Sequence, residues 1–228
     1  MRKLIFALLF LYPCFTFSQK LQPTEKDALL SVYVINAKQK PQEGEQVTFE
    51  SAQTKKTYSG ITKDSGKFEI LVPKGDKYNI KYKAFTSDAD YTVLDVPKGE
   101  NELLSFDVII QFEIPKKYTL KDVFFDSGKA SLRPESSKEL NLLVEYMKLK
   151  KTLVIEIAGH TDNVGVSDSN LKLSQDRANA VRDYLVKKGI DQTRVIAKGY
   201  GDTQALASNN TNEGKQKNRR TEVRLIKE

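Results

Sequence analysis

The first half of the chain alternates short apolar-rich runs with turn residues. Within residues 67–72, Phe68, Ile70 and Val72 fall at every second position and therefore share one face of an extended strand. Similar runs occupy residues 30–35, 47–49, 56–62, 78–82 and 103–114, and turn signals such as Asp64-Ser65-Gly66 separate them. Because the runs are short and no helical period lies between them, residues 28–114 are predicted to form an antiparallel β-sandwich.

In the second half the pattern changes to amphipathic helices between strands. Leu140, Leu143, Val144 and Met147 recur at the spacing of one helical face, and Pro134 suits the first turn of that helix. The other predicted elements are strands at 123–125, 153–157, 195–197 and 223–226, and a second helix with Ala178, Val181 and Leu185 on one stripe that ends at Gly189. This alternation predicts an α/β sandwich over residues 116–228, and so an α+β protein of two domains.

Residues 1–18 carry the pattern of a secretory signal peptide. A short basic start, Arg2 and Lys3, precedes an apolar run over residues 4–12, and small residues precede a cut after Ser18. The sequence therefore predicts export from the cytoplasm. No other apolar run approaches the ~18 residues that a membrane-spanning helix needs, which excludes a polytopic membrane protein.

Cleavage after Ser18 would remove Cys14, the single cysteine of the chain, and leave residues 19–27 as a linker before the sandwich. Disulfide and thiolate chemistry would then be absent from the mature protein. An alternative makes Cys14 a lipidation site, because a cysteine that closes an apolar stretch resembles the end of a bacterial lipoprotein signal. The pattern leaves both alternatives open.

The net charge of +7 arises in the second half of the chain, where residues 116–228 hold 22 basic and 15 acidic side chains. The basic residues are interspersed with acidic ones. The lysine-rich pieces at 148–151 and 187–188 lie at predicted helix ends. They lack the interleaved aromatic residues of a groove that binds single-stranded nucleic acid. The charge pattern therefore indicates a solvated surface and not a nucleic-acid partner.

The densest group of polar residues follows the predicted strand at 153–157. Gly159-His160-Thr161-Asp162 stands where that strand leaves the sheet, and Arg177 lies on the helix that comes next. Asp162 and Arg177 are fifteen positions apart, which is enough for the loop and the first helical turns to fold back. Both side chains are therefore expected to border one cleft.

These residues belong to a linked set of motifs that resembles a known family. The set consists of Gly159-His160-Thr161-Asp162, Asn170-x-x-Leu173-Ser174-x-x-Arg177-Ala178-x-x-Val181, Gly199-x-Gly201 and Asn218-Arg219-Arg220. It is similar to the C-terminal domain of the OmpA family, a peptidoglycan-binding module with a βαβαβ α/β sandwich, and covers about residues 118–228. The resemblance agrees with the fold that the apolar periods predict.

The resemblance implies a ligand site. In the family, an Asp and an Arg at the places of Asp162 and Arg177 hold the diaminopimelate side chain of the peptidoglycan stem peptide. The free end of that side chain bears an ammonium, which a carboxylate answers, and a carboxylate, which a planar guanidinium can take through two hydrogen bonds. Asp126, Leu173, and Asn218 with Arg219 of the Asn-Arg-Arg motif are carried over as further residues of the same cleft.

A second resemblance concerns the first half of the chain. Residues 41–44, 62–68 and 72–78 resemble the carboxypeptidase-regulatory-like, transthyretin-like sandwich family. The shared motifs consist of turn residues and core spacing, so they imply a fold without a function. The sandwich is expected to act as a spacer or as a module that contacts a protein.

Catalysis is the weaker alternative. His160 is the only histidine, and a zinc site needs three or four ligands, so neither a metal nor a cofactor is predicted. Asp126 and Asp162 could be the two carboxylates of a wall hydrolase. An arginine directed at one of them would keep that acid ionised, which suits binding better than proton donation.

Together these observations predict a non-enzymatic protein of the periplasm or outer membrane of a Gram-negative-type bacterium. It is expected to bind peptidoglycan and to tether the wall to the outer membrane or to a partner. The alternative is a periplasmic adaptor whose sandwich binds another envelope protein.

Overall fold

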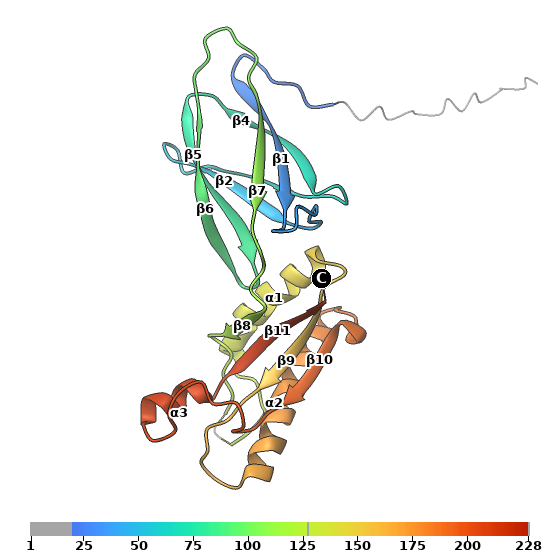
Figure 1. The fold of residues 1–228 in the computed structure, drawn as a ribbon, viewed down its shortest axis with the longest axis vertical. Coiled ribbons are helices and arrows are strands. Elements are labelled where there is room, and N and C mark those ends of the chain that lie inside the picture. The colour runs from blue at the N-terminus through green and yellow to red at the C-terminus, as the bar shows by residue number, and fades with distance from the viewer. Residues whose placement is uncertain (1–19, 127, 228) are drawn as a thin grey trace, which may run out of the picture.

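The computed structural model describes residues 20–126 and 128–227, and Figure 1 shows how they are arranged. The predicted signal peptide, Cys14 and the cut after Ser18 lie outside these residues. The chain forms an all-β N-terminal unit, residues 20–114, and a C-terminal unit of helices and strands that begins at residue 116. The two units follow one another along the long axis of the molecule.

Two sheets make up the N-terminal unit. The strands are β1 (Asp27–Ile35), β2 (Gln46–Ser51), β3 (Thr57–Ile61), β4 (Lys67–Pro73), β5 (Asp76–Ala84), β6 (Ser87–Val96) and β7 (Ser105–Gln111). One sheet has the order β4-β1-β7 and the other the order β3-β2-β5-β6. Alternate side chains of both sheets, including Leu30, Phe49 and Val72, are buried in one shared hydrophobic cluster.

The N-terminal unit departs from the expected pattern in two places. β1 and β7 pair in parallel, from Leu29 opposite Ser105 to Ile35 opposite Gln111, so the predicted purely antiparallel arrangement is wrong at that edge. β6 was not expected, because most of its residues are polar and exposed. It pairs with β5 alone, at the edge of its sheet, and an edge strand does not need an apolar period.

In the C-terminal unit, one mixed sheet carries helices on one face. Its elements are β8 (Lys117–Leu120), the 3₁₀ turn η1 (Pro134–Ser136), α1 (Ser137–Leu149), β9 (Val154–Gly159), α2 (Ser167–Lys187), η2 (Gln192–Arg194), β10 (Val195–Gly199), α3 (Asn212–Asn218) and β11 (Thr221–Lys227). The strand order is β10-β9-β11-β8, with β9 and β10 parallel and β11 antiparallel to both neighbours. The last strand of the chain is thus inserted between β8 and β9.

Two elements of this unit differ from the expectation. The predicted strand at 123–125 is wrong: β8 lies earlier, and Phe125 makes only an isolated bridge to Leu132. The segment after β8 is held by side chains instead, since Phe124 N donates to Ser136 Oγ at 2.9 Å. α3 was not expected, because its sequence is polar throughout and has no apolar stripe.

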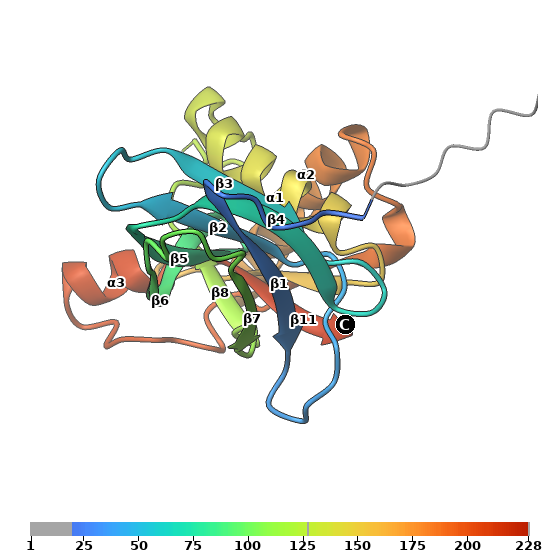
Figure 2. The same ribbon diagram turned by 90° about the horizontal axis from the view of Figure 1, so that it is seen from above.

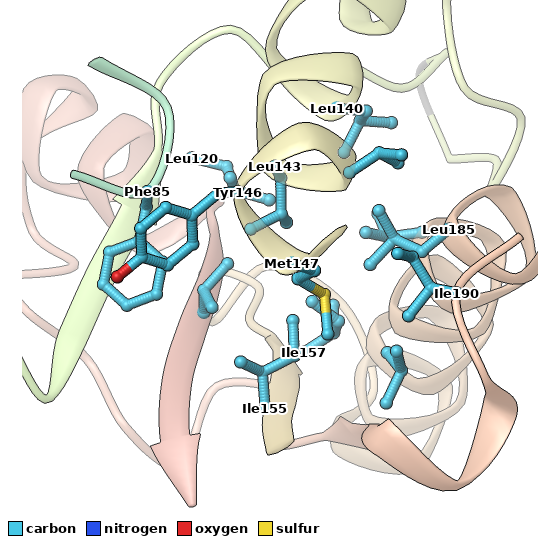
Figure 3. Close-up of a cluster of buried hydrophobic side chains, with 14 of the residues drawn as sticks. Phe85, Leu120, Leu140, Leu143, Tyr146, Met147, Ile155, Ile157, Leu185 and Ile190 are labelled. Atoms are coloured by element: carbon cyan, nitrogen blue, oxygen red, sulfur yellow. The ribbon is translucent and has the colours of Figure 1, made fainter. Parts of the chain in front are cut away.

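α1 and α2 lie together on the sheet (Figure 2), and their apolar stripes meet β9 and β11 in the core that Figure 3 shows. Leu143 and Met147 of α1 and Leu185 of α2 are fully buried there with Ile155 and Ile157 of β9. These are the helical stripes and the strand that the periods predict. The core fixes the helices over the sheet and so determines where the loops at its edge lie.

The core of the C-terminal unit also contains a residue of the N-terminal unit. Phe85, at the turn between β5 and β6, is fully buried, and its ring lies 5.1 Å from that of Tyr146 and 5.6 Å from that of Tyr118. Next to it, Thr86 Oγ1 donates to Glu139 Oε1 at 3.2 Å. Contacts between the units therefore cross the predicted boundary at residues 114–116.

Candidate functional site

Two glycines bring α2 against the ends of β9 and β10. A Cβ atom on Gly159, the last residue of β9, would lie 2.2 Å from the backbone oxygen of Ser174, and one on Gly199 would lie 2.4 Å from the backbone nitrogen of Gln175. No side chain fits in either place. The side chain of Gln175 uses this proximity, because its Oε1 accepts from Gly199 N at 2.8 Å. The loop after β9 and the next helix are thereby held side by side.

Asp162 lies in that loop and is held in place by the backbone around it. Its Oδ1 accepts from Val164 N at 3.0 Å, and its backbone oxygen accepts from Asn170 Nδ2 at 3.3 Å. Thr161 N donates to Gly201 O at 2.9 Å, which ties the loop to the end of β10. The Asp162 side chain is only 10 % exposed, and a fixed carboxylate of this kind favours a cation beside it.

Arg219 provides that cation. It follows α3, and its Nη1 donates to Asp162 Oδ2 while its Nη2 donates to Gln216 Oε1. The Arg219 side chain is 42 % exposed, so this ion pair lies at the surface. The sequence placed both residues near one cleft without predicting that they pair.

Arg177 lies on α2, and its guanidinium rests on the ring of Phe125, with Cζ 5.1 Å from the ring centroid. Its Nε donates to the backbone oxygen of Lys129 at 3.0 Å. Within the part of the chain that the structure describes, no carboxylate lies within ion-pair distance of this guanidinium. Arg177 is therefore oriented by neutral groups, and among the described residues nothing accepts a hydrogen bond from its two terminal nitrogens.

The three charges of the cluster influence one another. Burial lowers the pKa of Arg177, the charge of Arg219 lowers it further, and the carboxylate of Asp162 raises it. Arg177 thus feels the charges of both Arg219 and Asp162, and the Asp162 carboxylate is already paired with Arg219. The arrangement has an excess positive charge, which favours an anion beside Arg177.

The other predicted site residues lie at different distances from this cluster. Asp126 follows Phe125, is about half exposed, and its Oδ1 lies 3.4 Å from Arg133 Nε. Leu173 lies one helical turn before Arg177 and is half-buried on the same side of α2. Asp126 is thus close to the cluster because its neighbour Phe125 contacts Arg177. Leu173 is close because it lies on the same helix as Arg177.

Asn218 has a supporting role in the geometry. It is fully buried, its Oδ1 accepts from the backbone nitrogens of Leu206 and Ala207 at 2.7 and 3.0 Å, and its Nδ2 donates to Ala207 O at 2.9 Å. Both polar atoms of the Asn218 side chain are therefore already hydrogen-bonded within the protein, and neither is left for the predicted contact with a ligand. The side chain instead holds the loop that leads to Arg219.

His160 lies behind the loop, away from solvent. It is 1 % exposed, its ring stacks on that of Tyr200 at 5.4 Å, and its Nε2 lies 3.5 Å from Glu222 Oε2. Burial lowers the pKa of His160, and the hydrogen bonds from His160, Arg220 and Arg224 lower the pKa of Glu222. This packing suits a structural group.

Sequence reasoning missed Phe125 and Lys129, which orient Arg177. Phe125 was assigned to a strand core, and Lys129 contributes only its backbone oxygen, which no side-chain pattern reveals. The position of Phe125 directly before Asp126 in the first predicted loop was the one available signal.

The described residues contain no group of three or more His, Cys, Asp or Glu side chains placed to hold a metal ion. None of the helices in that part of the chain is long and apolar enough to cross a bilayer.

Residues 124–219 match the model of the OmpA family. Among curated proteins, outer membrane protein A of Bordetella avium is 39 % identical over 105 residues, which are 46 % of this chain and 54 % of that protein. The peptidoglycan-binding protein ArfA of Mycobacterium tuberculosis is 38 % identical over 101 residues, 44 % of this chain and 31 % of that protein. The matched segment spans about half or less of each relative.

Among solved structures, the peptidoglycan-associated lipoprotein of Burkholderia pseudomallei is similar with a TM-score of 0.44 and 28 % identity, over 49 % of this chain and 91 % of that one. The family match contains Asp126, Asp162, Leu173, Arg177 and Arg219. The C-terminal unit is therefore OmpA-like, as its motifs predicted.

Proposed function

We propose that this protein is a non-enzymatic protein of the bacterial cell envelope whose OmpA-like unit binds peptidoglycan through the diaminopimelate of the stem peptide. Asp162 would take the ammonium at the free end of the diaminopimelate side chain. Arg177 would take the carboxylate on the same carbon atom. Binding of this kind needs no turnover, metal or cofactor.

One observation supports the proposal: the Arg177 guanidinium is close enough to the nearly buried Asp162 carboxylate to feel its charge, and no carboxylate among the described residues pairs with it. A zwitterion is the ligand that such a pair recognises. Arg177 is already oriented by the ring of Phe125 and the backbone oxygen of Lys129, so little side-chain entropy is lost when it binds an anion. A planar guanidinium held in one orientation suits two parallel hydrogen bonds to a carboxylate.

The comparisons support the ligand class. The match to the OmpA family contains Asp162 and Arg177, and ArfA, a relative over this segment, is named a peptidoglycan-binding protein. The roles of the individual residues and the choice of diaminopimelate rest on the motifs and the geometry.

A single site of this kind binds weakly. Charge-assisted hydrogen bonds contribute about 1.5–3 kcal/mol each, and association consumes several kcal/mol, so the expected dissociation constant is of the order of micromolar to millimolar. The wall repeats its stem peptide many times. Occupancy on the polymer is therefore much higher than on a soluble fragment.

The rest of the chain fits an exported tether. The signal-like residues 1–18 would direct the protein to the periplasm, where cleavage after Ser18 would release it or a lipid on Cys14 would hold it at the outer membrane. The N-terminal unit, which we take to be a carboxypeptidase-regulatory-like sandwich, would hold the wall-binding unit at a set distance.

An adaptor role has one observation in its favour. β6 forms hydrogen bonds on one side only, and its side chains Tyr91 and Val93 are 37 % and 55 % exposed. Such an edge can pair with a strand of another protein. A pull-down from an envelope extract with residues 20–228, repeated with Val93→Lys, tests whether a partner binds there.

The main experiment is co-sedimentation of residues 20–228 with purified sacculi. We expect binding to sacculi that contain diaminopimelate and little binding to sacculi whose stem peptide carries lysine, because lysine lacks the carboxylate that Arg177 would take. Asp162→Asn and Arg177→Lys should each weaken binding by about tenfold or more, since the first removes the charge that holds the ammonium and the second removes the planar group that makes two parallel hydrogen bonds. Arg182→Lys, on the same helix but paired with Asp183, is the matched control.

Undiminished sedimentation of both Asp162→Asn and Arg177→Lys would overturn the proposed site. Equal binding to lysine-type sacculi would overturn the choice of diaminopimelate. The same samples test the hydrolase alternative, which requires that the purified protein release soluble muropeptides from sacculi.

A further inference from the structure

A second cavity of about 570 Å³ adjoins the proposed site on the far side of Arg219. One wall is formed by the end of β8 and the residues that follow it, and the other by the end of α3. These two segments are far apart in the sequence. Its lining includes Lys121, Phe124, Leu206, Lys217, Arg219 and Arg220. Nothing in the function proposed above uses this cavity.

The charges around the cavity are all of one sign. None of its described lining residues is acidic, and four of them are lysine or arginine. Arg220 is paired behind the cavity with Glu222 at 2.8 Å, and Arg219 with Asp162, whereas Lys121 and Lys217 make no ion pair among the described residues. An anion is therefore the ligand that this cavity favours.

The walls also offer apolar contacts. Phe124 is 44 % exposed and Leu206 is 62 % exposed, although both are large apolar side chains. Their exposed surface lies beside the cationic groups. This combination suits a carboxylate that is attached to an apolar carbon chain better than a small inorganic ion.

Arg219 links this cavity to the proposed diaminopimelate site, on which the present inference rests. When a ligand ammonium approaches Asp162, it competes with Arg219 for the same carboxylate. A zwitterionic ligand end supplies no second anion, so Arg219 would lose its partner. A second carboxylate on the same ligand, placed in the cavity, would restore that partner.

The stem peptide supplies such a group one residue before diaminopimelate. D-glutamate is joined through its γ-carboxyl group, which leaves its α-carboxylate free. We propose that the cavity between β8 and α3 is a second subsite that binds this α-carboxylate, with Lys121, Lys217 and Arg219 as the cationic groups. The protein would then distinguish stem peptides with a free α-carboxylate from those in which it is amidated.

The test is calorimetric titration of residues 20–228 with three probes: free meso-diaminopimelate, the tripeptide L-Ala-γ-D-Glu-meso-diaminopimelate, and the same tripeptide with the glutamate α-carboxylate amidated. We expect the acidic tripeptide to bind roughly fivefold more tightly than the amidated one, as one partly exposed charge contact allows. The double variant Lys121→Gln/Lys217→Gln should lose this difference and bind the amidated peptide as before.

Lys63→Gln/Lys187→Gln, two exposed lysines outside the cavity, changes the net charge equally and should leave the difference intact. Equal affinity for the two tripeptides, or an unchanged difference in Lys121→Gln/Lys217→Gln, would overturn the second subsite. In that case Asp162-dependent binding of free meso-diaminopimelate would leave the first site standing. If none of the three probes binds, the proposed function fails and the subsite fails with it.

Discussion

Two acid–base pairs of this molecule contrast in a way that separates structural support from ligand binding. Glu45, before β2, pairs with Lys150 at the end of α1, and their side chains are 1 % and 5 % exposed. Asp162 pairs with Arg219, and their side chains are 10 % and 42 % exposed. Both pairs join distant parts of the chain. Only the second has a cation that solvent and a ligand can reach.

The first pair is closed to exchange. Lys150 Nζ also donates to the backbone oxygen of Glu43 at 3.0 Å, and a Cβ atom on Gly44 would lie 2.3 Å from the backbone oxygen of Leu149. The backbone of the N-terminal unit thus touches the end of α1 directly, at a glycine with φ of +72°. Both side chains are almost fully buried, so this pair holds the two units together.

The largest expected effect comes from breaking the buried pair. Lys150→Ala leaves the Glu45 carboxylate buried without its cation, which should lower the free energy of unfolding by about 3–5 kcal/mol. Urea unfolding of residues 20–228 measures this change. Lys151→Ala, at the exposed neighbouring lysine, is the control and should be nearly neutral. Equal costs for the two variants would show that the pair does not hold the units together.

The contacts between the units are also where the sequence was least informative. Apolar periods predicted α1, α2 and β9, because each of these elements shows its buried face in a short stretch of sequence. Phe85 looks like one more strand residue of the first half, and nothing near it indicates that its ring belongs to the core of the second. Contacts between residues so far apart in the sequence leave no local pattern.

The site divides in the same way. Asp162 and Arg177 were found because linked motifs mark them. The pairing of Asp162 with Arg219 depends on α3, a polar helix without an apolar stripe, and the orientation of Arg177 depends on a backbone oxygen. Motifs therefore identified the charged groups, while the way these groups pair is set by the three-dimensional fold.

A third acidic group extends the comparison to pH. Glu222 is 6 % exposed and is shared by His160, Arg220 and Arg224, while the ring of His160 stacks on Tyr200. Because burial lowers the pKa of His160 in the folded protein, the unfolded chain takes up a proton there first. Stability should therefore be complete above about pH 6.5 and decline below it, by at most about 1.4 kcal/mol per pH unit.

Urea unfolding at pH 7.5 and pH 5.5 measures this decline. The lowered pKa of Glu222 adds a second loss that begins only below about pH 4.5, so the two losses begin at different pH values. His160→Gln should remove the loss between pH 7.5 and 5.5 and leave a smaller loss at lower pH, because Arg220 and Arg224 still lower the pKa of Glu222. A decline of equal size in His160→Gln would assign the first window to other groups.

The smallest expected effect sharpens the comparison most, because it uses two adjacent arginines. Arg219→Gln removes the exposed cation of Asp162 and should change the free energy of unfolding by less than about 1 kcal/mol, as is usual for pairs that solvent reaches. Arg220→Gln removes a guanidinium whose side chain is 6 % exposed and which is bound to Glu222, and should cost several times more. Thermal and urea unfolding of the two variants give the ratio directly. If Arg219→Gln proves the more destabilising, Arg219 is a structural group like Lys150. A ligand ammonium could then not displace Arg219 from Asp162, because breaking that ion pair would cost too much free energy.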